Sequence, residues 1–439
     1  MPVLDTAHHS TLGTLFIFGV ALAALVIGIL YGVGIIGTKN TPEPPEIEPI
    51  RPTTTVCDGE FQTPNQTISL PVPFAEGNSF GVFATSPDQS KVLVANQYTA
   101  DNIEYQRLVR VFEYDGQNWT AALSSTDPNL IPPQFQLAGG AITDDGRSIF
   151  IREDGWTTNT SVWAVVITSP NSLVIQFVLE LMDEEPVQIE VLDNTHFMML
   201  TLSSGTTANI RVVEQIPDNS GDLSLRWKIT QTLSLDNVAG VGLSMGITND
   251  RLRAVVNATT GFIELQRNTN LTWFIAKKYS LPAGTKFFDN QPVLSAGGLI
   301  LVMGNSTWTP NATVTAVGKV WIYTRPTLLQ NFTLLTTYTP TTPVNNALFG
   351  SNISASENLL FISSDQFSKG LPEGKIGVFE LLENELVLME TITGTNTGEF
   401  GCVTNLGKAT TASGENQFLF TPQFEPSGPG TINTYAFSC

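Results

Sequence analysis

The chain has 439 residues, enough for one large domain or two ordinary ones. Its 21 basic and 40 acidic residues give a net charge of −19, which argues against a nucleic-acid binder, because such proteins present a basic face to phosphate. Hydrophobic residues make up 42% of the chain, so it can form a packed core and is not intrinsically disordered. Three His and three Cys are too few for a zinc finger, and they form no haem-attachment or thioredoxin-type motif.

An uncharged apolar run, residues 12–36, comes after a short N-terminal segment of residues 1–11. Its 25 residues are long enough to cross a hydrocarbon core of about 30 Å, and they predict a transmembrane α-helix. A cleaved signal peptide is the alternative, but no Lys or Arg precedes the run and no A-x-A site comes after it. Gly28 and Gly32 have the spacing of a helix-dimer motif, which is a weak signal in so glycine-rich a segment.

Residues 37–56 contain five prolines and predict an extended stalk, with a plain flexible linker as the alternative. Lys39 and Arg51 slightly favour a cytoplasmic side for the C-terminal domain, but a large domain crosses a membrane largely regardless of such small biases. We therefore expect a single-pass membrane protein. Its C-terminal domain would be extracellular, lumenal or on a virion surface.

The remaining residues, 57–439, repeat one kind of segment at a spacing of about 54 residues. The segment is a short, strongly apolar strand, and it occurs seven times: VLVAN (92–96), IFIRE (149–153), FMMLT (197–201), LRAVV (252–256), LILVM (299–303), LLFIS (359–363) and FLFTP (418–422). An opening strand precedes it in several units, as in residues 79–86, 240–248, 348–356 and 399–405, and a hairpin comes after it, as in residues 108–124, 261–281 and 375–392. The pattern predicts an all-β, seven-bladed β-propeller of four-stranded blades, with a pair of β-sandwiches as the alternative.

The opening strands resemble FG-GAP repeats, the propeller family of integrin-alpha type. Phe80-Gly81, Phe349-Gly350 and Phe400-Gly401 match the first element of the family pattern. Many members carry a calcium loop of Asp-x-Asp-x-Asp-Gly type, but the corresponding turns, residues 86–91, 143–148 and 354–359, do not supply three alternating oxygen ligands. We therefore expect neither calcium nor any other metal or cofactor.

The last repeat lacks a fourth strand, and residues 66–73 form a spare strand before the first repeat. Donating this strand to the last blade would close the ring and leave no open edge. A disulfide between Cys57 and Cys439 would then replace the missing hairpin, and the entropic model gives such a large loop about 4–5 kcal/mol of stabilisation. Cys402 is expected to be a free core thiol, with pairing to either terminal cysteine as the alternative. A disulfide requires an oxidising compartment.

Nine Asn-x-Ser/Thr sequons lie after the apolar run and fit a domain in the secretory pathway. They are Asn65, Asn118, Asn159, Asn257, Asn270, Asn305, Asn311, Asn331 and Asn352.

Catalytic motifs are nearly absent. His196 is the one histidine after the apolar run and is expected to be a solvated turn residue, as are the acids of Asp144-Asp145 and Asp183-Glu184-Glu185. No G-x-S-x-G, H-E-x-x-H, P-loop or sialidase Asp-box occurs. Trp119, Trp227 and Trp273 fall at hairpin positions that pack between blades, whereas Trp156 and Trp308 lie in loops and are the candidate binding residues.

The sequence therefore predicts a non-enzymatic, membrane-anchored propeller for surface recognition, adhesion or structural display. Its partner would be a protein or glycan on a surface, with self-association possible. Related propellers occur in eukaryotic adhesion receptors and in large DNA viruses of protists. The chain is more similar to the viral group because it lacks the calcium loops and companion domains of receptors. The alternative is a glycan hydrolase or lyase that uses the central face, and a converging acid pair of raised pKa there would favour it.

Overall fold

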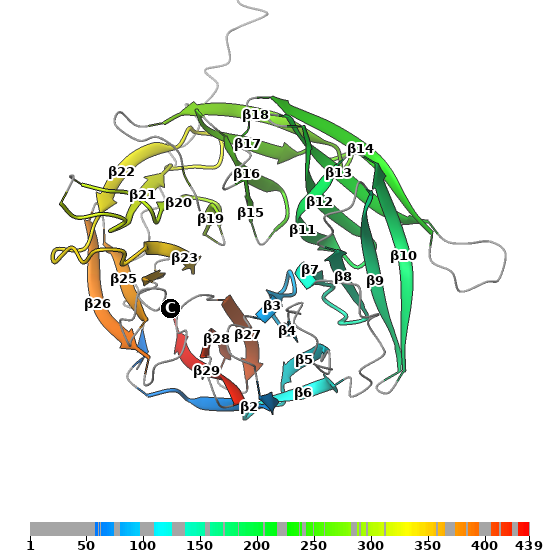
Figure 1. The fold of residues 1–439 in the computed structure, drawn as a ribbon, viewed down its shortest axis with the longest axis horizontal. Helices are drawn as coiled ribbons and strands as arrows, with labels where there is room; N and C mark the ends of the chain where they lie inside the picture. The colour runs from blue at the N-terminus through cyan, green and yellow to red at the C-terminus, as the bar shows by residue number, and fades with distance from the viewer. Residues whose placement is uncertain are drawn as a thin grey trace, which may run out of the picture. The chain divides into compact units, whose positions relative to one another are not determined.

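The computed structural model describes residues 58–438 with gaps, the largest being 74–79, 97–108, 125–136, 217–225, 282–287, 365–373 and 395–404. Residues 1–50 form a unit of their own, none of which is described. In the second unit, every described element is a β-strand, and the strands form sheets arranged in a ring (Figure 1). The fold is an all-β propeller.

Six sheets have four antiparallel strands each, and we number these blades in chain order. Blade 1 comprises β3 (Phe80–Thr85), β4 (Lys91–Asn96), β5 (Val109–Tyr114) and β6 (Trp119–Ser124). Blade 2 comprises β7 (Leu137–Ile142), β8 (Ser148–Glu153), β9 (Asn159–Ser169) and β10 (Ser172–Met182). Blade 3 comprises β11 (Glu185–Asp193), β12 (His196–Ser204), β13 (Thr207–Ile216) and β14 (Arg226–Asp236).

The other three blades have the same order from the inner to the outer strand (Figure 1). Blade 4 comprises β15 (Met245–Ile247), β16 (Arg253–Ala258), β17 (Gly261–Arg267) and β18 (Trp273–Ser280). Blade 5 comprises β19 (Val293–Leu294), β20 (Ile300–Asn305), β21 (Lys319–Thr324) and β22 (Thr333–Tyr338). Blade 6 comprises β23 (Phe349–Ala355), β24 (Leu359–Ser364), β25 (Lys375–Leu382) and β26 (Glu385–Thr393).

The remaining sheet, which we call the closing sheet, joins both ends of the second unit. It contains β27 (Asn405–Thr411), β28 (Gly414–Gln423) and β29 (Pro429–Ser438), and β29 pairs with both β1 (Asp58–Gly59) and β2 (Gln66–Pro73). The spare strand before the first repeat thus lies beside the last strand of the chain. Asp58 is opposite Ser438 in this pairing, and Cys57, Cys402 and Cys439 lie outside the described residues. The Cys57–Cys439 disulfide stays a prediction.

Two parts of the fold prediction need correction. The repeats predict seven four-stranded blades, but the described strands form six, and the closing sheet has five strands because two N-terminal segments pair with β29. The predicted transmembrane helix is not found either. Residues 12–36 lie outside the description, and within it no helix is long and apolar enough to span a membrane.

Apolar side chains fill the spaces between neighbouring sheets, because each apolar second strand presents side chains to both faces of its sheet. The three tryptophans expected in the core are there: Trp119 and Trp273 are almost fully buried, and Trp227 is buried against Phe150 and Phe197. All seven apolar segments form second strands, β4, β8, β12, β16, β20, β24 and β28, so this part of the prediction is confirmed.

Glutamine side chains also join neighbouring sheets by pairing with the backbone of one residue in the next sheet. Gln66 donates to the Trp119 carbonyl at 2.8 Å and accepts from its N–H at 2.7 Å. Gln231 makes the same pair of bonds with Trp273, and Gln188 with Met245. Each pair satisfies backbone groups of a strand that has no further partner strand on that side.

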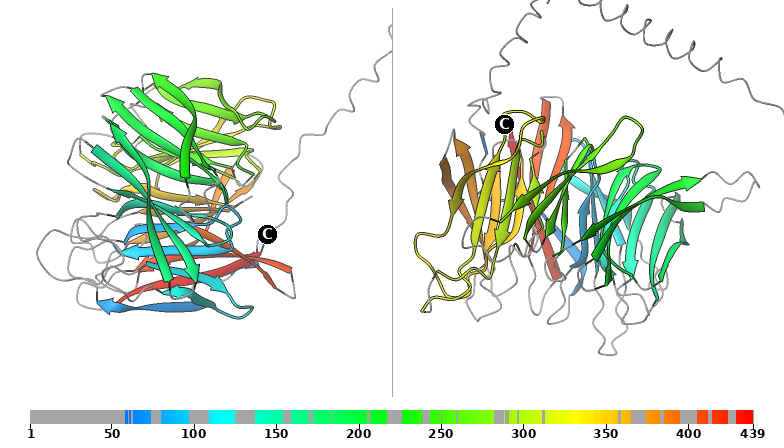
Figure 2. Two further views of the ribbon diagram at one scale, coloured as in Figure 1. Left: turned by 90° about the vertical axis from the view of Figure 1, so that its right-hand side faces the viewer. Right: turned by 90° about the horizontal axis from the view of Figure 1, so that it is seen from above.

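The strands run between two ends of the ring (Figure 2). At the turn end, the first strand of a blade connects to the second and the third to the fourth, through segments such as 248–252 and 268–272 in blade 4. At the loop end, the second strand connects to the third, as through residues 306–318 in blade 5. Blades 1 to 4 touch at or beside their first turns, which places these turns together at the same end. In blade 5, Arg325 donates to Gly298 in the first turn of its own blade and to Glu264 of blade 4.

Candidate functional site: the centre of the turn end

One hydrogen-bonded turn recurs where the first strand meets the second. In blade 2, the Thr143 hydroxyl donates to Asp145 at 2.6 Å and accepts from the Ser148 N–H at 3.0 Å. Thr248 makes the same two bonds in blade 4, and Ser86 makes them in blade 1. Ser295 of blade 5 keeps only the bond from the backbone. A short side chain that binds nearby backbone in this way fixes a tight turn.

The fourth residue of these turns has a left-handed backbone. Its φ is 67° at Gly146 and 67° at Gly298, but the same position is Gln89 in blade 1, with φ 60°, and Arg251 in blade 4, with φ 56°. A non-glycine residue is strained in this region by about 1–2 kcal/mol. Backbone strain of this kind gathers at functional sites, so a residue that keeps it is a candidate for function.

Arg251 lies among carboxylates from four blades. Its Nη1 is 3.9 Å from Glu190 Oε2, and the two side chains are only 12% and 21% exposed. Asp88, Asp144 and Asp250 also act electrostatically on its guanidinium. The buried Nε of Arg251 has no hydrogen-bond partner among the described residues. We call these five residues the Arg251 cluster.

The blades hold the cluster together by direct bonds. The Asp88 N–H of blade 1 donates to Asp144 of blade 2 at 2.8 Å. Gln188 donates to Glu190 at 2.6 Å from two residues away on β11, and its amide also pairs with Met245 of blade 4. Glu190 lies on the innermost strand of its blade, so the cluster lies at the centre of the ring at the turn end.

The acids of the cluster differ in pKa. Burial raises the pKa of Glu190 above its ordinary value, although the charge of Arg251 and the bond from Gln188 act against it. Burial also raises the pKa of Asp144, with a contribution from the charge of Asp88. At Asp88 burial acts in the same direction, but bonds from Ser86 and Ser90 outweigh it and lower the pKa. The centre therefore holds acids of contrasting proton affinity beside one guanidinium.

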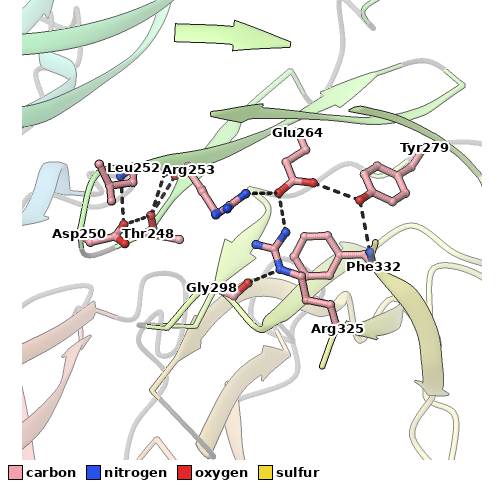
Figure 3. A network of polar contacts seen from close by, with 9 residues as sticks. All are labelled: Thr248, Asp250, Leu252, Arg253, Glu264, Tyr279, Gly298, Arg325 and Phe332. Atoms are coloured by element: carbon pink, nitrogen blue, oxygen red, sulfur yellow. Dashed lines mark hydrogen bonds and ion pairs between the residues drawn. The ribbon is translucent and has the colours of Figure 1, made fainter. Parts of the chain in front are cut away.

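A second buried network supports the turn that carries Arg251 (Figure 3). Glu264 accepts from Arg253 at 3.2 Å and from Arg325 at 2.6 Å, and its other oxygen accepts from the Tyr279 hydroxyl at 3.0 Å. Arg325 also donates to the Gly298 carbonyl and lies over the Phe332 ring. Burial raises the pKa of Tyr279 to about 12, so its hydroxyl keeps its proton. Because Arg253 ends the turn that carries Arg251, this network links that turn to blade 5.

The sequence analysis did not identify this centre. Asp144 is in it, but it was expected to be solvated. His196 and Glu184 were expected to be solvated too, and both predictions are wrong. The His196 side chain is 17% exposed and lies 2.9 Å from Asp193, and Glu184 is 10% exposed and takes two bonds from Arg211. Aligning the turns would have shown Arg251 at the position of Gly146 and Gly298, a signal present in the sequence.

The two candidate binding tryptophans lie elsewhere. Trp308 is half-buried in the loop-end connection of blade 5, where its ring packs against the core and lies 5.0 Å from Lys319 Nζ. It is thus at the end opposite the Arg251 cluster. Trp156 lies outside the described residues. Among the described residues, no group of acids, His or Cys could hold a metal ion.

The predicted glycosylation sites divide by burial. Asn65, Asn118, Asn270 and Asn331 are exposed, and Asn352 is half-buried in β23. Asn257 is 1% exposed and Asn305 is 5% exposed, so neither side chain has room for a sugar in this fold. Asn311 lies outside the described residues. Asn159 is in β9, but the burial of its side chain is not among the described features.

No family model and no curated protein matches this chain, which leaves the FG-GAP resemblance without support. Solved structures match at the level of the fold. The periplasmic gluconolactonase PpgL of Pseudomonas aeruginosa has a TM-score of 0.48 at 11% identity, covering 71% of this chain and 84% of that one. The β-propeller domain of Myceliophteria thermophila Cps50 (Swd1) has a TM-score of 0.45 at 10% identity, covering 84% and 99%. Likeness at this level concerns the propeller fold alone.

Proposed function

We propose that this propeller is a surface recognition module, and that it takes a small polar ligand at the Arg251 cluster. The observation that carries the proposal is Arg251 itself. It keeps a strained backbone where two sibling turns have glycine, and its buried Nε has no partner among the described residues. An unpaired buried donor carries a free-energy cost that a bound acceptor atom would offset. Backbone strain carries a further cost and gathers at functional sites.

The charges around Arg251 define the ligand class. Four carboxylates offer hydrogen-bond acceptors, and one guanidinium offers donors. Hydroxyl groups satisfy both because they donate and accept, and an ammonium group donates to the acids. A carboxylate or phosphate would be repelled by the acids and by the net charge of −19. We therefore favour a sugar or amino sugar.

Three monosaccharides with the same pyranose ring test this ligand class. Glucose has only hydroxyl groups, glucosamine adds an ammonium group, and glucuronate adds a carboxylate. Saturation-transfer NMR on the full chain should detect glucosamine and glucose more strongly than glucuronate. Arg251→Gly should remove the signal, and Gln89→Gly, which changes the same turn position without removing charge, should keep it. If all three sugars give no signal, or if both variants behave alike, the proposal is wrong.

A glycan-active enzyme is the second candidate, because Glu190 and Asp144 have raised pKa values at the centre. A carboxyl group of raised pKa can act as a general acid beside an ionised partner. Hydrolysis of a polysaccharide by the purified protein, lost in Glu190→Gln, would favour this candidate over simple binding.

The location at a membrane surface is part of the proposal. It rests on the apolar run at residues 12–36 and on the sequons, and residues 1–57 lie outside the described part of the chain. Protease added to intact cells or particles should reach the propeller if the location is right.

A further inference from the structure

The exposed sequons share one end of the ring. Asn118, Asn270 and Asn331 lie in the turns that join the third and fourth strands of blades 1, 4 and 5, and Asn65 directly precedes β2, which has the place of a fourth strand in the closing sheet. All four are exposed. They therefore lie on the rim of the turn end, around the central Arg251 cluster.

The two buried sequons lie at the other end. Asn257 and Asn305 are the last or next-to-last residues of the second strands β16 and β20, at the loop end of blades 4 and 5. Asn257 donates to the Ser244 hydroxyl at 3.0 Å. A sugar on either asparagine would displace part of the core. The sequons that can carry a glycan thus lie at the turn end, and these two, which cannot, lie at the loop end.

Exposed leucines stand beside two of the usable sequons. Leu271 comes directly after Asn270, is 52% exposed and has a φ of 62°, and Leu329 lies two residues before Asn331 and is 92% exposed. Singly exposed apolar side chains are normal on a protein surface, and a neighbouring group that covers them removes apolar area from water. A sugar on the neighbouring asparagine is near enough to do so, and its apolar ring faces suit a leucine.

We propose that N-linked glycans occupy Asn65, Asn118, Asn270 and Asn331, and that those on Asn270 and Asn331 cover Leu271 and Leu329. The glycans form a collar around the turn end, with the Arg251 cluster at its centre. This inference rests on the export that is part of the proposed function, and it does not depend on sugar binding by Arg251.

Glycopeptide mass spectrometry of the protein from its native source tests the collar. The expected result is glycan at Asn65, Asn118, Asn270 and Asn331 and unmodified asparagine at Asn257 and Asn305. Unmodified peptides at the four rim sites, or a glycan at either buried site, would overturn the proposal. Binding of glucosamine to the Arg251 cluster is measured separately by NMR. A negative result in one experiment therefore does not affect the interpretation of the other.

The cover itself is tested with single variants of the full chain. Asn270→Gln and Asn331→Gln should each lose one glycan and show about twofold more fluorescence of the apolar dye ANS, because a leucine becomes open. Asn118→Gln is the matched control, since no large apolar residue in its described turn is exposed, and it should lose a glycan without a change in dye binding. An equal dye response in all three variants would contradict the covering role.

Discussion

The first turns of blades 2 and 4 have the same hydrogen bonds but different residues at their strained position. Thr143 and Thr248 each bind an aspartate two residues on and the backbone five residues on. The left-handed residue is Gly146 in one turn and Arg251 in the other. The turn therefore needs the hydroxyl and the aspartate, while the arginine adds nothing to its hydrogen bonding. What the arginine adds is a charge at the centre of the ring.

The residues that end the turns also differ. Lys91 ends the blade 1 turn and pairs with Glu113, whose side chain is 46% exposed, at 3.0 Å. Arg253 ends the blade 4 turn and pairs with Glu264, which is 5% exposed and shared with Arg325. The same turn is thus held by a surface ion pair in blade 1 and by a buried network in blade 4.

Removing the buried acid should have the largest effect. Glu264→Gln leaves two buried guanidinium groups without a counter-charge, and we expect it to lower the free energy of unfolding by about 3–5 kcal/mol. Glu113→Gln breaks the exposed pair and should lower it by less than about 1 kcal/mol. Urea denaturation of both variants measures the difference. Similar losses in the two would mean that blade 4 is no better supported than blade 1.

Removing the shared hydroxyl should have a smaller and equal effect in the two turns. Thr143→Val and Thr248→Val each leave a buried backbone N–H without its acceptor, and we expect losses of about 1–3 kcal/mol. Thermal unfolding under the same buffer conditions compares them. A much larger loss at Thr248 would show that the Thr248 hydroxyl also supports the Glu264 network.

The sequence was sufficient for the strands and their order, because apolar runs, turn residues and a regular spacing are local signals. It also predicted that the spare strand at residues 66–73, which is β2, joins the last sheet, and its pairing with β29 confirms this. It did not show that β1 pairs with β29 as well, because that pairing joins residues about as far apart as the domain allows. The sequence also placed the opening strand of the closing sheet too early. It predicted this strand at residues 399–405, whereas β27 begins at Asn405. Residues 399–404 lie outside the described part of the chain.

The candidate site was harder to predict for a physical reason. Whether an acid is solvated or buried depends on which blades meet, and Glu264 meets Arg325 across 61 residues of sequence. The left-handed φ of Arg251 likewise cannot be predicted from the sequence of its own turn alone. It can be predicted only when the sequences of the turns are aligned, because the glycines of blades 2 and 5 then have the same position as the arginine.

The pH dependence of stability should have opposite signs for two acids of the cluster. The pKa of Glu190 is raised, so its contribution is present below its unfolded pKa and lost as the pH rises through the folded value. Glu190→Gln should therefore gain stability relative to wild type as the pH rises from about 4, near the ordinary pKa of glutamate, toward neutral. The pKa of Asp88 is lowered, so its contribution is present at neutral pH and lost on acidification, and Asp88→Asn should be the less stable protein at pH 7. Thermal unfolding across this range measures both, and parallel curves for the two variants would show that the assignment of the shifts is wrong.

The smallest expected effect separates strain from charge at the fourth turn position. Gln89→Gly relieves the left-handed backbone and should raise the free energy of unfolding by about 0.5–1 kcal/mol. Arg251→Gly relieves the same strain but removes the one cation among four carboxylates, so it should give no gain at pH 7. On acidification toward about pH 4, Glu190 and Asp144, whose pKa values are raised, take up protons first, so the missing charge matters less. Arg251→Gly should then approach the gain seen in Gln89→Gly. If Arg251→Gly is the more stable variant at both pH values, the guanidinium contributes nothing to the folded ring and its retention can only serve a ligand. If the variant is destabilised equally at both, Arg251 is a structural residue, and the proposed binding site loses its main support.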